Sequence, residues 1–201
     1  MSLETYDELK VSLKNWIDRD DLDPFLPDFI RLAESRFNRQ LRLRAMERME
    51  KTNTVGGQSN YNLPSDFLQG REFRLNTNPS KSLQYITPEI YESWNLGAGF
   101  PKFYTIVADQ LRLGPVPDGE SEMEMLFYGK VPSLGTTRPT NWILLNAPDI
   151  YLYGTLLEAE AFLQNDPRIQ LWKQGFDTAV ADLQLQDEKD RHSASSLVIR
   201  S

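Results

Sequence analysis

Arginines form the one basic stretch of this acidic sequence. The 201-residue chain has a formal net charge of −7, yet residues 31–51 hold seven Lys and Arg against three Asp and Glu. The arginines that could bind a partner are Arg31, Arg36, Arg39, Arg42 and Arg44. They could contact nucleic acid or an acidic protein surface, or form a solvated face whose aliphatic stems cover apolar surface. Because the same chain supplies acids at both of its ends, we expect ion pairs across a boundary between subunits. The acidic chain as a whole disfavours direct contact with DNA.

An acidic cluster at residues 18–23 has a density of carboxylates like that of a calcium loop. Leu22 stands at its fifth position, where such a loop needs a carboxylate or an amide, and Asp23 stands at the sixth, where it needs glycine. We therefore interpret the cluster as a solvated connection between helices that supplies a helix cap.

The sequence carries no enzyme signature. It has no phosphate-binding loop, no dinucleotide-binding glycine motif, no His-Glu-x-x-His and no Gly-x-Ser-x-Gly. Cysteine is absent and His192 is the only histidine, which leaves little for thiol, imidazole or zinc chemistry. Asp and Glu are abundant enough to supply a catalytic pair, but no pair stands out. We expect no catalytic residue, no metal and no cofactor, and hence no enzyme.

The C-terminal tail ends in an apolar triplet, Leu197, Val198 and Ile199, after a polar, Ser-rich segment. Apolar residues on a polar tail cost solubility unless something covers them. The tail could fold back on its own core or dock on another protein, and we favour docking because the composition of the linker is flexible.

Helices are expected at both ends of the chain. Thr5 and Glu8 form a capping box, which predicts a helix over about residues 5–19. A second helix should begin at Asp23-Pro24 or at Leu26-Pro27 and end at about residues 44–48. Its predicted buried stripe is Leu26, Ile30, Ala33, Phe37 and Leu41. Residues 150–163 are apolar on most sides, which indicates a central helix. A fourth helix follows Asp166-Pro167, and its predicted buried stripe is Ile169, Trp172, Phe176, Ala179, Val180 and Leu183.

The middle of the chain has strand character. Residues 51–55, 71–75 and 122–128 favour strands, and residues 103–107 and 110–113 predict a hairpin around Ala108-Asp109. Thr87 should cap a short helix. We expect Trp16, Trp94, Trp172, Met123 and Met125 to lie in the core.

These elements predict an α+β fold, in which N- and C-terminal helix pairs form a bundle and a small antiparallel β domain is inserted between them. The expected boundaries are residues 1–48 and 147–190 for the bundle, 49–146 for the inserted β domain with its short helix, and 191–201 for a flexible docking tail. No stretch is apolar enough to cross a membrane, and the acidic start does not look like a secretory signal.

Several local patterns resemble the phage adaptor family, the head–tail connector proteins of tailed bacteriophages. They are Phe29–Arg42, Tyr61–Phe67, Gly99–Tyr104, Leu111–Gly119, Pro139–Trp142, Pro148–Gly154 and Glu158-Ala159. Their order and spacing carry the resemblance, which covers about residues 5–185 and leaves out the stretch from Asp187 on.

This resemblance implies a structural protein of the virion neck, assembled in the host cytoplasm. It would form a homo-oligomeric ring, expected to be a dodecamer, that binds the portal protein and tail or nozzle proteins. The genome would pass through the ring without sequence-specific binding, and no membrane would be involved. The tail triplet would then dock on the portal. The alternatives are another tail, neck or baseplate component, or a DNA-binding packaging accessory, which would bind duplex DNA with a steep salt dependence.

Overall fold

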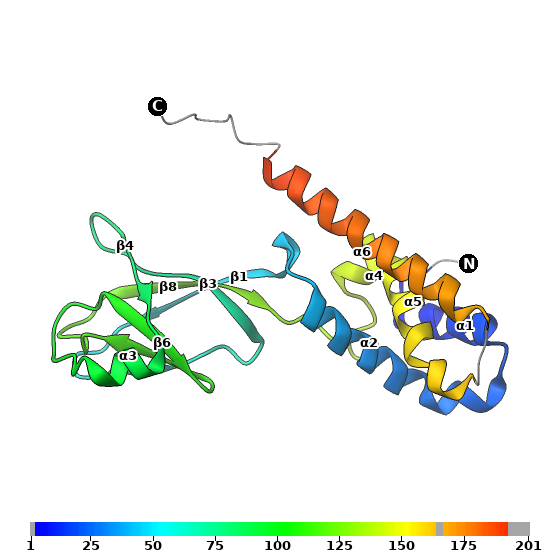
Figure 1. The fold of residues 1–201 in the computed structure, drawn as a ribbon, viewed down its shortest axis with the longest axis horizontal. Coiled ribbons are helices and arrows are strands. Elements are labelled where there is room, and N and C mark those ends of the chain that lie inside the picture. Colours follow the sequence, from blue (N-terminus) through cyan, green and yellow to red (C-terminus); the bar gives the residue numbers. More distant parts are fainter. Residues whose placement is uncertain (1–2, 164–166, 193–201) are drawn as a thin grey trace. The chain divides into compact units, whose positions relative to one another are not determined.

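The computed structural model describes residues 3–163 and 167–192, and these form an α+β structure of two compact units. The helical unit combines the two ends of the chain, up to Ala45 and from Val131 on, and the β unit is Met46–Lys130. Figure 1 shows all the labelled helices except α3 in the first unit, and α3 with two mainly antiparallel sheets in the second. The helical unit contains α1 (Tyr6–Ile17), η1 (Asp20–Phe25), α2 (Leu26–Gln40), α4 (Trp142–Asn146), α5 (Pro148–Glu158), η3 (Glu160–Phe162) and α6 (Ile169–His192), and η2 (Arg44–Met46) leads into the β unit.

Helix α1 begins as the capping box predicts. The Glu8 N–H donates to the Thr5 hydroxyl, and the Thr5 N–H donates to the Glu8 carboxylate. The helix ends two residues before the predicted limit because Asp18 adopts the left-handed conformation, with φ of 56°. This conformation stops helical hydrogen bonding while the Asp18 N–H still donates to the Lys14 carbonyl.

Helix α2 starts at Leu26 and ends at Gln40, so the predicted end at residues 44–48 is wrong. Leu41 is already extended, with φ of −92° and ψ of 138°. The Arg42 guanidinium donates to the carbonyls of Asn38 and Leu41, which satisfies acceptors that the helix end leaves open. The predicted stripe is confirmed, because Leu26, Ile30, Ala33, Phe37 and Leu41 are all buried.

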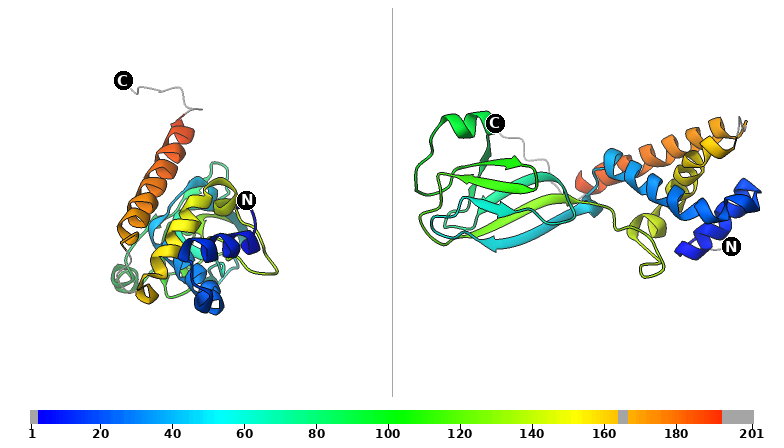
Figure 2. Two further views of the ribbon diagram at one scale, coloured as in Figure 1. Left: turned by 90° about the vertical axis from the view of Figure 1, so that its right-hand side faces the viewer. Right: turned by 90° about the horizontal axis from the view of Figure 1, so that it is seen from below.

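Helix α5 is central to the helical unit, as its composition predicts. It packs against α1, α2, α4 and α6, and Figure 2 (left) shows it, in yellow, between the blue α1 and the orange α6. Gly154 allows the close approach of α2 and α6, since a Cβ there would meet the Phe37 ring at 2.9 Å and the Phe176 ring at 3.2 Å. On α6, Ile169, Trp172, Phe176 and Ala179 of the predicted stripe are buried, while Val180 and Leu183 are half-buried.

The β unit consists of two four-stranded sheets, with strand orders β1-β8-β3-β4 and β2-β7-β6-β5. The strands are β1 (Glu47–Asn53), β2 (Asn60–Asn62), β3 (Phe67–Leu75), β4 (Lys81–Ser82), β5 (Gln84–Tyr85), β6 (Phe103–Val107), β7 (Gln110–Gly114) and β8 (Glu122–Gly129), and α3 is Pro88–Ser93. All pairs are antiparallel except β5 with β6. The predicted hairpin is confirmed as β6 and β7, and Thr87 caps α3.

The core of the β unit lies between the two sheets. Met123, Met125 and Phe127 of β8 are buried and belong to one cluster with Phe73 of β3 and Leu111 of β7. Alternation along β8 therefore identified its inward face from the sequence.

The observed end of the β unit, Lys130, lies earlier than the expected residue 146. Residues from Val131 on join the helical unit through polar contacts with α2. The Val131 N–H donates to the Asn38 side chain over 2.8 Å, and the Leu134 N–H donates to Glu34 over 2.7 Å. Helix α4 then packs on α5.

Candidate interaction surfaces

The predicted arginine site divides among three elements. Arg31, Arg36 and Arg39 lie on α2, Arg42 follows its end, and Arg44 begins η2. Arg31, Arg39 and Arg44 are exposed, while Arg36 and Arg42 are half-buried. The structure therefore does not place all five arginines on one helix face, because the chain leaves the helical path at Leu41.

Arg36 joins α2 to α5. Its Nε and Nη2 lie 2.7 and 2.5 Å from Glu158 Oε1, and its guanidinium lies 5.9 Å from the centre of the Phe176 ring. The Arg42 guanidinium, as described above, closes the end of α2. Both side chains thus make contacts within the chain, whereas Arg31 and Arg39 extend from the outer face of α2.

A buried polar cluster that the sequence analysis missed centres on Glu34, which is 3% exposed. Its Oε1 accepts from the Leu134 N–H and, over 3.1 Å, from the Tyr151 hydroxyl. The Asn141 amide donates to the Tyr151 oxygen and to the Pro132 carbonyl. This cluster fixes the segment between the β unit and α4 against α2 and α5. The sequence could have indicated that Glu34 is buried, because it falls at helical spacing between Ile30 and Phe37 on the buried stripe.

Burial raises the pKa of Glu34 above its ordinary value, because desolvation disfavours the charged carboxylate. Hydrogen bonds from the Leu134 N–H, Ser133 and Tyr151 act in the opposite direction, as does the charge of Arg31. Burial also raises the pKa of the Tyr151 hydroxyl, and the Glu34 charge adds to that shift.

The acidic cluster at residues 18–23 connects α1 to α2, and several of its carboxylates form ion pairs within the chain. Lys14 Nζ lies 2.9 Å from Asp20 and 2.7 Å from Asp23, and Arg19 pairs with Asp21. The segment forms the 3-10 helix η1, which leads directly into α2. Across residues 3–163 and 167–192, no group of three or more His, Cys, Asp or Glu is arranged to hold a metal ion.

Several large apolar side chains are exposed on the helical unit. Trp16 is 39% exposed, so its predicted place in the core is wrong, and Leu32 and Leu171 are 50% and 64% exposed. In the β unit, Trp94 is 50% exposed, so its predicted place in the core is also wrong. Its ring packs edge-on against Phe103 at the surface. Trp172, Met123 and Met125 are buried as predicted.

The tail triplet Leu197, Val198 and Ile199 and the predicted cap Asp166 lie outside the described residues. Within the described part of the chain, every helix is too short or too polar to span a membrane.

A family model for a phage adaptor matches this chain over residues 4–200, and its description is SU10 adaptor protein. The chain belongs to the SU10 adaptor protein family. The resemblance found in the sequence is thereby confirmed, and the match extends into the stretch beyond Asp187, where no resemblance was recognised. No curated protein matches the chain.

Proposed function

We propose that this adaptor is a structural head–tail connector of a tailed bacteriophage. Copies of the chain form a ring, expected to be a dodecamer, which binds the portal protein on one side and tail or nozzle proteins on the other. The genome passes through the ring during packaging and ejection. The observation that carries this proposal is the family match over nearly the whole chain.

The charge of the subunit supports a conduit rather than a DNA-binding protein. Each copy has a formal net charge of −7, so twelve copies together carry −84. A conduit should not retain DNA, because each phosphate that a protein neutralises adds salt-dependent affinity. An acidic ring favours sliding of the genome over adhesion.

The arginines have separate roles in this proposal. Arg31, Arg39 and Arg44 are exposed, and we assign them to the boundary with a neighbouring subunit. Arg36 and Arg42 support that surface from within, because their contacts with Glu158 and with the end of α2 hold the helix in position. The triplet Leu197, Val198 and Ile199 is assigned to portal docking.

Electron microscopy of the purified protein, with and without the portal, tests the proposal. We expect closed rings that cap the portal. A protein that stays monomeric when mixed with the portal would contradict it. Affinity for duplex DNA should be measured over a range of salt concentrations in parallel. Tight binding with a steep salt dependence would favour a packaging accessory instead.

A further inference from the structure

An open groove of about 480 Å³ lies on the helical unit between α1, α5 and α6. Its apolar lining includes Trp16, Tyr153 and Leu171. The Trp16 and Tyr153 rings meet edge to face, with centroids 6.0 Å apart. Tyr153 also packs closely against the backbone of α6, since a Cβ on Gly175 would lie 2.9 Å from its ring. The groove is therefore lined by a packed aromatic pair and by an exposed apolar side chain, Leu171.

The polar residues of the groove give it an acidic character. Asp149 at the start of α5 and Asp182 on α6 both line it, together with the uncharged Gln174 and Thr178. A surface of this kind, an apolar centre with carboxylates around it, is suited to an apolar side chain that has basic neighbours.

The outer face of α2 has the complementary composition. Leu32 is 50% exposed, although it lies on a well-packed helix. Arg39 lies two turns further along the same side of the helix, and Asp28 lies one turn before Leu32 on that side. Arg31 flanks this side, one residue before Leu32, and all three charged residues are exposed. Leu32 is therefore a protruding apolar residue with one arginine on its side of α2 and a second on its flank, against a single acid.

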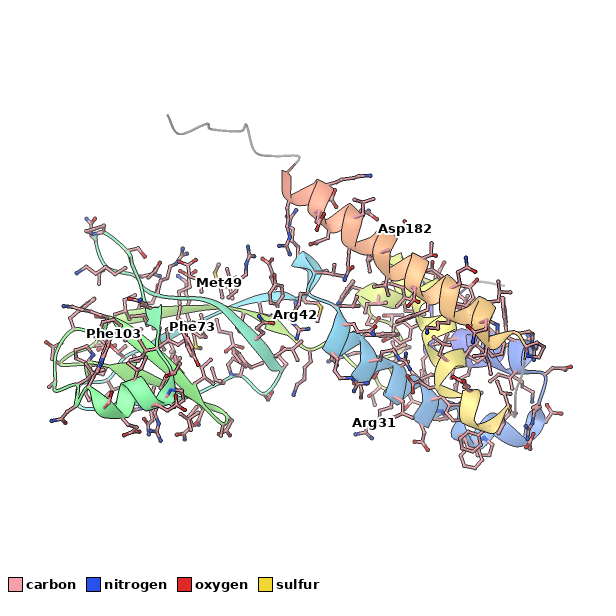
Figure 3. All side chains as sticks on the ribbon, viewed as in Figure 1. Arg31, Arg42, Met49, Phe73, Phe103 and Asp182 are labelled. Carbon is pink, nitrogen blue, oxygen red and sulfur yellow. The ribbon has the colours of Figure 1, made fainter. Side chains whose placement is uncertain are left out.

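These two surfaces lie on opposite sides of the helical unit. In Figure 3, Arg31 projects below α2 while Asp182 lies on the far side, on α6. One copy therefore cannot place its own α2 face in its own groove. A second copy can, and since every copy has both surfaces, the contact repeats from head to tail, which is the type of contact that closes rings.

We infer that the groove between α1, α5 and α6 receives the α2 face of a neighbouring copy, with Leu32 against Trp16 and Leu171 and the arginines toward Asp149 and Asp182. This inference rests on the proposed ring and names the surfaces that build it.

Disulfide cross-linking tests this pairing directly, because the chain has no native cysteine. The full-length variant L32C/L171C should form a ladder of covalent multimers on mild oxidation. The matched control L32C/K173C uses an exposed α6 residue that does not line the groove, and it should remain largely uncross-linked. Both variants should be imaged by electron microscopy before oxidation.

The outcomes separate this inference from the proposed function. Rings without a ladder, or equal ladders in both variants, would refute the pairing while leaving the connector proposal intact. If no rings form even with the portal, the connector proposal fails, and the pairing fails with it.

Charge exchange gives a second test that does not depend on cysteine geometry. The variant R31E/R39E makes the α2 face acidic, and the variant Q174K/D182R makes the groove basic. Each alone should self-associate roughly tenfold more weakly than the native chain. An equimolar mixture should assemble again, because each altered surface then meets an opposite charge on its neighbour. If both variants fold, as judged by circular dichroism, and the mixture does not assemble, the pairing is wrong.

Discussion

The Tyr151 hydroxyl donates a hydrogen bond to the Glu34 carboxylate over 3.1 Å, within the interior of the helical unit. The same carboxylate oxygen accepts from the Leu134 N–H. A single buried acid thus connects α2, α5 and the segment that follows the β unit. A buried acceptor that lacks its donors costs free energy, and so does a buried donor that lacks its acceptor. This cluster should therefore contribute to the stability of the protein and to the pH dependence of that stability.

Replacing Glu34 with leucine should destabilise the protein. The change leaves the Leu134 N–H and the Tyr151 hydroxyl without their acceptor, which should lower the free energy of unfolding by about 1–3 kcal/mol. Urea denaturation measures this. Glu34→Gln is the matched control, because glutamine keeps an oxygen acceptor without the charge, and its loss should be smaller. A leucine variant as stable as the glutamine variant would contradict the role assigned to the hydrogen bonds.

The pH dependence of stability should carry a contribution from Glu34. Its pKa is raised in the folded protein above the ordinary value of 4.5. The folded state therefore binds the proton more tightly than the unfolded state. The resulting stabilisation is fully present below the unfolded pKa and is lost as the pH rises through the folded pKa. Comparing the native chain with Glu34→Gln from pH 4 upward should show this decline in the native chain only. Parallel curves would show that the Glu34 proton is not linked to folding.

Two arginines on α2 should respond differently to removal of their charge. Arg36→Gln breaks the contact with Glu158, which is only 17% exposed at its side chain, and should cost about 1 kcal/mol. Arg39→Gln alters an exposed side chain and should change stability by less than about 0.5 kcal/mol. Thermal unfolding of both variants, followed by circular dichroism, checks the difference. Equal effects would show that the Arg36 contact does not stabilise the subunit.

Trp172 is fully buried on α6, and its truncation should leave a large cavity. We expect Trp172→Ala to lower the free energy of unfolding by about 3–5 kcal/mol. The preceding residue, Leu171, is mostly exposed, so Leu171→Ala should have an effect below about 0.5 kcal/mol on the isolated subunit. Chemical denaturation of the two variants tests the assigned orientation of α6, and a small effect at Trp172 would argue against it.

Removal of residues 193–201 should leave a folded subunit that no longer binds the portal. The truncation deletes the triplet Leu197, Val198 and Ile199, to which we assign the docking contact. Co-purification with the portal measures the loss, and a full-length variant with Val198→Asp provides a control of unchanged length that should also fail to bind. Portal binding that survives the truncation would assign the contact to another part of the chain.

The sequence predicted those helix starts and strand faces that depend on interactions between residues close together in the chain. The capping residues Thr5 and Thr87 marked helix starts because their hydroxyls satisfy backbone N–H groups within the same turn. The spacing of Met123, Met125 and Phe127 at every second position identified the inward face of β8, since alternate side chains of a strand lie on the same face.

Features that depend on distant contacts were not predictable in this way. The end of α2 follows from the chain leaving for β1 and from the bonds that Arg42 makes, although the basic residues there would suit a longer helix. The two-residue strands β4 and β5 carry no periodic pattern of their own. Among the interaction residues, the arginine run was visible in the sequence. The groove was not, because Trp16, Tyr153 and Leu171 come from three separate helices.

The β unit enters and leaves the rest of the chain through neighbouring strands, since Glu47 of β1 is paired with Tyr128 of β8. The two peptide connections that attach the β unit are therefore adjacent. The chain between these two connections can change without a rearrangement of the helical unit. An insert attached in this way can be exchanged for another without changing the sequence of the helical unit. The same two attachment points would accept a fluorescent or affinity module whose own termini lie side by side.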